Sequence, residues 1–465
     1  MKRSLFFLIF MGLSSSANAV VTKKKVVKKT KQVREARPAP APEQAPEPEE
    51  PFFTGSWSGQ GEVAFEFRKF KDDNVATTKD TGAAIFTRLE TKYESDVSKH
   101  VLRFFSRVDP KDSDRDFVTF EDAYLSNRLG ESQGIKVLAG YKLFNWTATE
   151  AFHPADQINS RNYDSDLENL EKKGELTVEL AFDTPVGALS FFYWPRFEKP
   201  EFPGSHSRLG LGVNLKDPAL IDGTQEIGYS VGQFGAMTTI NLGDADLSLH
   251  GITHYDRNFP ITGTTNFVIH PSLGPVPVNS TEFTTTPTPY YFKTTQYGGT
   301  LQWSLFDMLL KLEGVARKFD SEKEVLTARG IRKPVDHQEV AGGLEYTFTL
   351  ESGIEWTWFL EGNAILGVDK DRRAEMSAFQ RDVMGGFRMA FNNIMGSELY
   401  ATAIHDIERD RENLFNLSYS QRLSDQWKFK TGVRVYSAPV KGSLPQGLET
   451  LNEDNHIFFN IYRYF

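Results

Sequence analysis

From residue 61 onward the chain alternates apolar and polar side chains with a period of two. In "GEVAFEFRKF", residues 61–70, one face carries Val63, Phe65 and Phe67, and the other carries Glu62, Glu66 and Arg68. A period of two is typical of a β-strand that is apolar on one face only. The pattern returns in "AAIFTRLETKY" and "IEWTWFLEGNA", so the sequence predicts a chain made mostly of strands.

The alternation predicts about 18 strands between residue 56 and the end of the chain. They are expected to begin near residues 56, 82, 99, 117, 134, 175, 187, 226, 245, 290, 307, 337, 353, 379, 397, 413, 426 and 455. Short turns follow the even-numbered segments, whereas the connections after most odd-numbered segments are longer and more polar. This combination predicts a transmembrane antiparallel up-and-down β-barrel.

Closure is the physical reason for choosing a barrel. A bilayer offers no water to unpaired backbone groups, so a sheet can span it only without edges. A soluble β-sandwich is the alternative, but it does not explain the asymmetry between the two rims. The expected strand number ranges from 16 to 20, because residues 200–226 could hold a further hairpin and the alternation slips near Gly232, as at a β-bulge. A barrel of this size should hold an aqueous lumen unless loops plug it.

The chain divides into three predicted parts. Residues 1–19 begin with Lys2 and Arg3, continue with an apolar stretch and end in Ala-Asn-Ala, which is typical of a cleaved signal peptide. Residues 20–51 are first basic and then rich in Pro and Glu, which predicts a disordered periplasmic linker. The β-barrel is expected to occupy residues 52–465.

Charge and composition narrow the function. The predicted barrel region carries 43 basic and 57 acidic residues, so nucleic-acid binding is not expected. The chain has no cysteine, which excludes disulfides and thiolate chemistry. The basic run from Lys23 to Lys31 is either a solvated arm or a contact to an anionic cell-wall polymer or lipid surface.

One hairpin resembles a known family. In "FEDAYLSNRLGESQGIKVLAGYKLFNW", Glu121, Ala123 and Tyr124 with an inserted Asp122 are followed by Gly140, Lys142 and Trp146. This arrangement resembles hairpins of Gram-negative outer-membrane porins and of the alginate-export-like barrel family, with Lys142 in place of the usual glutamine. The resemblance covers about thirty residues. It implies a porin-like channel in the outer membrane of a Gram-negative bacterium, among lipid and lipopolysaccharide.

The C-terminus, "HIFFNIYRYF", resembles the signal that directs barrels to the outer-membrane assembly machinery. Ile457, Phe459, Ile461 and Phe465 match this pattern, and they are expected to face lipid. The intervening residues His456, Phe458, Asn460, Tyr462 and Tyr464 are expected to face the lumen. Arg463 departs from the pattern and should lie at the periplasmic rim, where it can reach the headgroups. The linker and the C-terminus are both expected to be periplasmic.

If the apolar set faces lipid, the other set lines the lumen and defines two charged arcs. The expected basic arc consists of Arg88, Lys92, Arg103, Arg107, Lys136, Lys142, Lys428, Lys430 and Arg434. The expected acidic arc, across the pore, consists of Glu313, Glu339, Glu345, Glu355 and Glu361. Opposed arcs would create a transverse field that selects ions; alternatively, the charges only keep the wall hydrated.

The loop 146–173 is the third long loop, and in general porins the third loop folds inward. The resemblance therefore implies a constriction with candidate residues Glu150, Asp156, Arg161, Asp164, Asp166 and Glu168. We expect a porin-like channel through which small hydrophilic or charged solutes diffuse. The alternatives are an exporter-like barrel for polysaccharides and a non-conducting structural or adhesin barrel. Homo-oligomerisation is compatible with each.

No enzyme activity, metal or cofactor is expected. His250 and His254 share a strand face but lack a serine motif beside them. The acidic runs "DSDRD", residues 112–116, and "DSD", residues 164–166, have the carboxylate spacing of Ca²⁺ loops but lack the glycine and terminal glutamate. A plug domain of the TonB-dependent receptors does not fit into residues 20–51.

Overall fold

The structure is a computed structural model of the full chain. It describes residues 55–71, 78–165, 170–210, 214–221, 230–258, 260–279, 286–409, 412–442, 445–452 and 454–465. The predicted signal peptide, the linker and the basic run lie outside these residues. No helix in the described ranges is long and apolar enough to cross a membrane.

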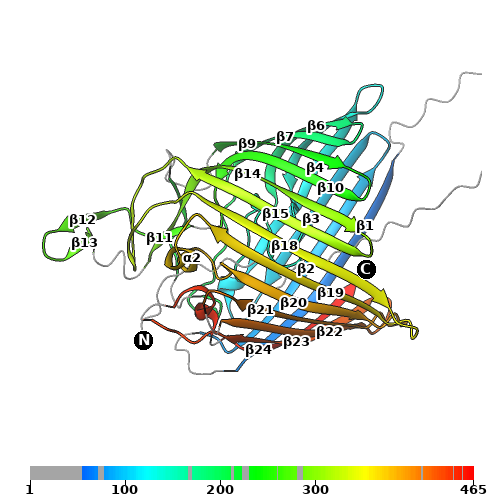
Figure 1. The fold of residues 1–465 in the computed structure, drawn as a ribbon. Helices are drawn as coiled ribbons and strands as arrows, with labels where there is room; N and C mark the ends of the chain where they lie inside the picture. Colours follow the sequence, from blue (N-terminus) through cyan, green and yellow to red (C-terminus); the bar gives the residue numbers. More distant parts are fainter. Residues whose placement is uncertain are drawn as a thin grey trace, which may run out of the picture.

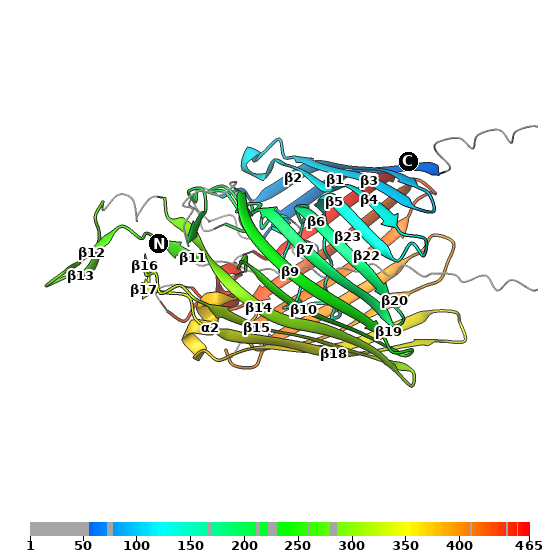
Figure 2. The same cartoon turned by 90° about the horizontal axis from the view of Figure 1, so that it is seen from above.

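The described residues form a closed antiparallel β-barrel of 18 strands (Figures 1 and 2). In chain order the wall consists of β1 (Ser56–Phe70), β2 (Thr81–Glu94), β3 (Ser98–Val108), β4 (Phe117–Leu129), β5 (Ile135–Lys142), β6 (Glu175–Thr184), β7 (Gly187–Arg196), β9 (Ser230–Asn241), β10 (Ala245–Tyr255), β14 (Thr288–Leu305), β15 (Met308–Phe319), β18 (His337–Thr349), β19 (Glu355–Leu366), β20 (Asp382–Ala390), β21 (Glu398–Asp406), β22 (Asn413–Arg422), β23 (Trp427–Ser437) and β24 (His456–Tyr464). Each strand pairs with the next, and β24 pairs with β1 to close the wall.

The predicted strands are confirmed, and every predicted start lies within a few residues of an observed one. The predicted rim asymmetry is also present. Two residues separate β6 from β7 and β14 from β15 at one rim, whereas residues 143–174, 197–229 and 256–287 connect strands at the other. We call these the short-turn rim and the loop rim.

The wall has an apolar outer surface. On β2 and β3, Ile85, Leu89 and Val108 are 50%, 42% and 53% exposed, whereas the inward-facing Arg107 is 2% exposed. Exposed apolar side chains recur on the outer face of the other strands. This is the surface that hydrocarbon would cover in a bilayer.

The last strand follows the predicted alternation. Ile457, Phe459 and Phe465 are exposed on the outside, whereas Phe458 and Asn460 are buried inside. The backbone of Phe465 exchanges two hydrogen bonds with Gly61, of 2.9 Å and 3.0 Å. The chain end is therefore part of the wall.

Arg463 pairs with Trp427, the first residue of β23, and thus lies at the short-turn rim. Its guanidinium lies 5.7 Å from the centre of the Trp427 ring. A cation over an indole face is favourable at the edge of a membrane. The aromatic partner explains how the strand accommodates this break in its pattern.

Two β-bulges modify the ladder. Between β3 and β4 the register shifts at Arg103, which pairs with Asp122, and Phe104, which pairs with Phe120. Glu121 is the extra residue, and both Glu121 and Asp122 are buried on the inward side. Between β7 and β9 the register shifts opposite Gly232, where the sequence predicted a bulge.

Smaller elements decorate the loop rim. They are η1 (Ser113–Arg115), β8 (Ala219–Ile221), β11 (Ile261–Gly263), β12 (Phe267–His270), β13 (Gly274–Pro277), β16 (Val325–Thr327), β17 (Gly330–Arg332), α2 (Lys370–Met376) and η2 (Gly447–Leu451). The hairpin β12–β13 projects beyond the barrel in both views (Figures 1 and 2). β8 pairs in parallel with β14, so the described part of 197–229 adds no strand to the wall.

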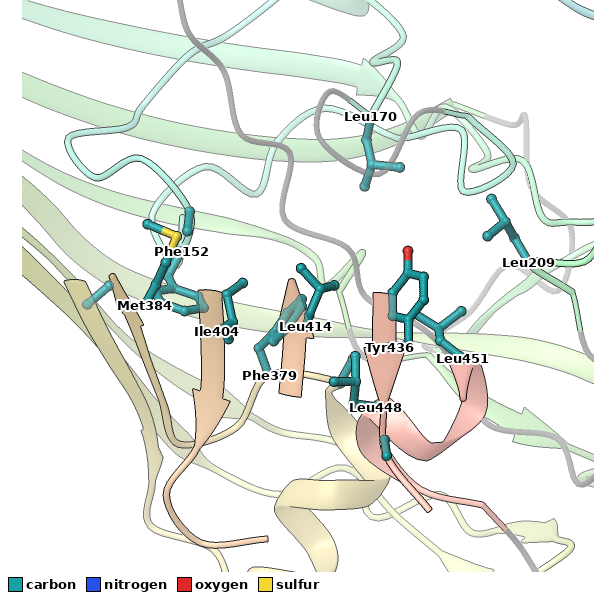
Figure 3. Packing of buried hydrophobic residues seen from close by; sticks show 14 of the residues in the cluster. Phe152, Leu170, Leu209, Phe379, Met384, Ile404, Leu414, Tyr436, Leu448 and Leu451 are labelled. Atoms are coloured by element: carbon teal, nitrogen blue, oxygen red, sulfur yellow. The ribbon is translucent and has the colours of Figure 1, made fainter. Parts of the chain in front are cut away.

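The lumen is packed with apolar side chains near the loop rim. Figure 3 shows Met384, Ile404, Leu414 and Tyr436 of the wall pointing toward side chains from the loops. The loop residues in this cluster include Phe152, Leu170, Leu209, Phe379, Leu448 and Leu451. A wall of this width cannot fill its own interior, and the loops provide the second layer of the core.

Candidate functional site: the lumen and its inward loop

The loop between β5 and β6, residues 143–174, lies inside the barrel. Its described residues are almost all buried, with Phe152 and Ala155 both 0% exposed. A surface loop would leave such side chains in water, whereas this one packs against two walls of the lumen. The contacts at its tip and base define its path.

Two carboxylates of the opposite wall hold the tip of the loop. Glu313 of β15 accepts hydrogen bonds from the backbone N–H groups of Ala148 and Thr149, at 2.5 Å and 3.0 Å. Glu361 of β19 accepts from the N–H groups of the next two residues, at 2.6 Å and 2.9 Å. These backbone N–H groups have no strand partner, so they need another acceptor. An ionised carboxylate is a strong acceptor and meets this need.

Cations on the same wall complete the attachment. Lys311 Nζ lies 2.7 Å from Glu150 of the loop and 2.6 Å from Glu345 of β18. Arg317 donates to the carbonyl oxygen of Pro154 at 3.2 Å and contacts Glu339. The loop therefore crosses the lumen from β5 and β6 to β15, β18 and β19.

The base of the loop contains a second ion cluster. Asp156 lies 3.2 Å from Arg161 and also contacts Lys172. Burial opposes ionisation of Asp156, yet the charges of Lys172 and Arg161 hold its pKa below the ordinary value. Burial lowers the pKa of Lys172, and the negative charge of Asp156 offsets part of this lowering. These paired charges fix the shape of the loop.

Glu171 joins the base of the loop to the first strands. Arg107 Nη2 lies 2.5 Å from Glu171 and 3.0 Å from Glu66 of β1. Burial raises the pKa of Glu171 to about 7; the neighbouring Glu66 adds to this rise and Arg107 opposes it. The group therefore titrates near neutral pH.

The predicted basic arc contains many carboxylates. Arg88 donates to Glu121 at 2.9 Å and to Glu62 at 2.6 Å. Arg103 lies 3.0 Å from Asp122 and also contacts Glu90. The wall formed by β1 to β4 is thus a ladder of alternating charges in which Arg88 and Arg103 each meet two carboxylates.

The remaining candidates lie on the inward face as well. Lys136 and Lys142 both contact Glu179 of β6 at 2.7 Å, and Lys92 contacts Glu94. On β23, Lys430 and Arg434 lie 5.7 Å and 5.2 Å from the centre of the Phe458 ring. Lys428 and Glu355 occupy inward positions of β23 and β19 near the short-turn rim.

The predicted loop residues divide into three groups. Glu150, Asp156 and Arg161 lie within the inward loop, as described above. Asp164 instead accepts from Ser207 at 2.8 Å and lies 3.5 Å from Arg115, both on other connections of the loop rim. Asp166 and Glu168 lie outside the described residues.

Residue-type patterns alone missed the inward carboxylates that pair with the predicted cations. They are Glu62, Glu66, Glu90, Glu94, Glu121, Asp122, Glu171 and Glu179. Most of these carboxylates occupy the same alternate, inward positions as the basic residues. A comparison of the inward positions of neighbouring strands would therefore have found them. Glu121 and Asp122 could not, because the bulge changes the phase.

A cavity of about 790 Å³ opens at the short-turn rim. Its lining includes the charged ladder, with Glu62, Arg88, Glu90, Arg103 and Glu121. Tyr464 and Phe465 of the chain end complete one side. The lumen is therefore polar and open near the short-turn rim, while apolar contacts fill much of it near the loop rim.

His250 and His254, the paired histidines of the sequence, both lie on β10 in the wall of the barrel. His250 Nε2 lies 3.0 Å from the amide nitrogen of Gln296, and its ring lies 5.0 Å from that of Trp146. His254 is 0% exposed. Neither is placed against a nucleophile in the contacts that the described residues make.

No family model and no curated protein sequence matches the chain. Among solved structures, an engineered variant of Rh. blastica porin is 13% identical, with 88% of this chain and 100% of that chain covered and a TM-score of 0.41. A loop-deletion mutant of OmpT, an outer membrane protein of Vibrio cholerae, is 11% identical, with 88% and 99% covered and a TM-score of 0.39. The assignment of the fold depends on the closed ladder of this chain itself.

Proposed function

We propose that this chain is an outer-membrane channel through which small hydrophilic or charged solutes diffuse, narrowed by the inward loop. The observation that supports this most directly is the attachment of the loop tip to Glu313 and Glu361. A loop held across the lumen by six hydrogen bonds to these two carboxylates reduces the cross-section while leaving the wall intact. The apolar outer surface supports the placement in a membrane.

The charged walls would determine which solutes pass. Cations of β23 and the charged ladder of β1 to β4 lie on either side of β24, with the acidic residues of β18 and β19 across the barrel. Charged rings and walls are how pores select ions. Because Lys428 and Lys430 place two like charges at successive inward positions of β23, we propose that they contribute to the ion preference of the channel.

A closed structural barrel is the second candidate, and one observation favours it. The apolar cluster at the loop rim fills part of the lumen with the side chains that Figure 3 shows. Such a barrel would still present its loops, including the β12–β13 hairpin, to the outside. Under both functions we propose that lipid and lipopolysaccharide surround the wall and that the assembly machinery recognises the strand ending at Phe465.

Single-channel recording separates these two functions. The full-length protein, folded in detergent, is inserted into a planar bilayer in symmetric KCl. Discrete and stable conductance steps are expected from a channel. A folded protein that enters the bilayer and remains silent would refute the channel and support the closed barrel.

Reversal potentials in a KCl gradient then test the charged walls. Lys428→Glu together with Lys430→Glu is expected to shift the potential toward cation preference. Lys318→Glu is a suitable control, because Lys318 is exposed at the loop-rim end of β15. An unchanged potential in the double variant would contradict the proposed role of β23.

A further inference from the structure

Two acidic motifs that the sequence singled out meet at the loop rim. Asp112 and Asp114 belong to the β3–β4 connection, around the short η1 turn. His206 belongs to the β7–β9 connection. One ligand atom from each of these three side chains lies within 4.8 Å of the others. His206 Nδ1 and Asp114 Oδ2 are 3.8 Å apart.

The second acidic motif supplies an independent observation at the same place. Asp164, from the inward loop, is 2% exposed. Its Oδ1 accepts from Ser207 Oγ at 2.8 Å and lies 3.5 Å from Arg115 Nε, so the carboxylate sits between the two connections that carry the three ligands. Its Oδ2 is buried and accepts no hydrogen bond from any described residue.

A buried carboxylate oxygen without a donor is costly, and it indicates that a positive group belongs nearby. Arg115 leaves this oxygen unpaired: its Nε lies beside Oδ1, its Nη1 contacts Asp109, and its buried Nη2 has no hydrogen-bond partner among the described residues. Asp112, Asp114 and Asp164 thus bring three carboxylates to this part of the loop rim, where the nearby Arg115 is paired with Asp109.

We propose that Asp112, Asp114 and His206 form a site for a divalent transition-metal ion such as Zn²⁺, with Asp164 as the charge beside it. Two carboxylate oxygens and one imidazole nitrogen are a ligand set that suits Zn²⁺, and water would complete the tetrahedron. Ca²⁺ prefers six to eight oxygen ligands, which this set does not offer.

The ion would connect three segments that are far apart in the sequence. They are the β3–β4 connection, the β7–β9 connection and, through Asp164, the inward loop. The site lies at the loop rim, where dissolved ions reach it: the side chains of His206 and Asp114 are 51% and 41% exposed. A bound ion would hold the base of the inward loop against the loop rim. This role does not depend on whether the barrel conducts ions.

Binding of Zn²⁺ alone tests the site. The full-length protein, purified in detergent without a polyhistidine tag, is titrated calorimetrically with Zn²⁺. One equivalent is expected per chain. His206→Gln and Asp114→Asn, at exposed positions, should each weaken binding more than about tenfold, since even losing a supporting residue costs that much. Asp164→Asn should weaken it about tenfold.

Matched controls make the result decisive. His270→Gln and Asp320→Asn replace an exposed histidine and an exposed aspartate elsewhere at the loop rim, and both should bind as the unchanged protein does. Absence of a saturable equivalent, or equal binding by the site variants and the controls, would overturn the proposal. Tighter binding of Ca²⁺ than of Zn²⁺, unaffected by His206→Gln, would overturn it as well.

Discussion

Replacing Glu361 by glutamine should loosen the tip of the inward loop. Glu361 accepts backbone hydrogen bonds from Glu150 and Ala151, at 2.6 Å and 2.9 Å. A glutamine keeps one acceptor oxygen but turns an NH₂ group toward the other donor. One charged hydrogen bond is therefore lost and the other becomes neutral.

The magnitude follows from these two bonds. A hydrogen bond to a charged group contributes about 1.5–3 kcal/mol and a neutral one about 0.5–1.5 kcal/mol. The closed loop should lose about 2.5–4.5 kcal/mol in free energy relative to an open one, which raises the open population roughly 60-fold to 1,600-fold. Glu313 still holds the neighbouring residues, so the barrel itself should remain folded.

Hydrogen exchange of the loop amides measures this directly. Peptides covering residues 148–155 of Glu361→Gln should exchange faster by the same factor, and single-channel current should become noisier. Glu355→Gln is the matched control. Glu355 occupies an inward position of the same strand, and its side chain makes no hydrogen bond or ion pair within the described part of the chain. Unchanged exchange in Glu361→Gln, or equal acceleration in Glu355→Gln, would refute the role of Glu361 as an anchor.

Three further predictions concern the base of the loop, the wall and the chain end. Glu171 has a pKa of about 7 in the folded protein, above its ordinary value, so the closed loop should be most favoured at low pH and lose about 3 kcal/mol of stability as the pH rises from about 4.5 to 7. The rate at which a protease cleaves the loop should rise over the same pH range. A pH dependence of cleavage that remains in Glu171→Gln would contradict this prediction. Arg107→Ala leaves Glu66 and Glu171 buried without their guanidinium and should destabilise the barrel by about 3–5 kcal/mol, measured by urea unfolding. As a comparison, Arg128→Ala breaks an exposed ion pair with Asp183 and should lower the free energy of unfolding by less than about 1 kcal/mol. Equal losses of stability in Arg107→Ala and Arg128→Ala would show that burial is not the cause of the larger expected effect. Deleting Phe465 removes two backbone hydrogen bonds to Gly61 and the final aromatic residue; it should lower the yield of heat-modifiable folded barrel in outer membranes, and an unchanged yield would count against the assembly signal.

The wall could be predicted from the sequence because its physics is local. Each strand must be apolar on one face, and the period of two is visible within ten residues. Even Arg463 and the bulge near Gly232 were recognisable as breaks in that period. The bulge at Glu121 was not, because both Glu121 and Asp122 are acidic and either could be read as the inserted residue.

The partners of the predicted charges could not be derived in the same way. Glu313 and Glu361 were predicted to line the lumen, and they face inward, but they bind loop amides about 160 and 210 residues earlier in the chain. Backbone N–H groups carry no sequence signal. Whether an inward carboxylate faces water or a loop depends on the tertiary course of that loop, which the periodicity of the strands does not encode.

A signal for the inward loops was nevertheless present in the inward-facing positions themselves. On the strands from β19 to β23 these positions are charged near the short-turn rim, at Glu355, Arg388, Glu398, Arg422 and Lys428. Toward the loop rim each of these strands has a buried apolar inward residue, namely Ile365, Met384, Ile404, Leu414 or Tyr436, and on β20 and β21 the buried Asp382 and Asp406 follow at the strand ends. Apolar side chains do not line water without cost. A lumen wall that changes from charged to apolar along its strands therefore requires a covering layer at its apolar end, and the long loops are the segments within reach to provide it.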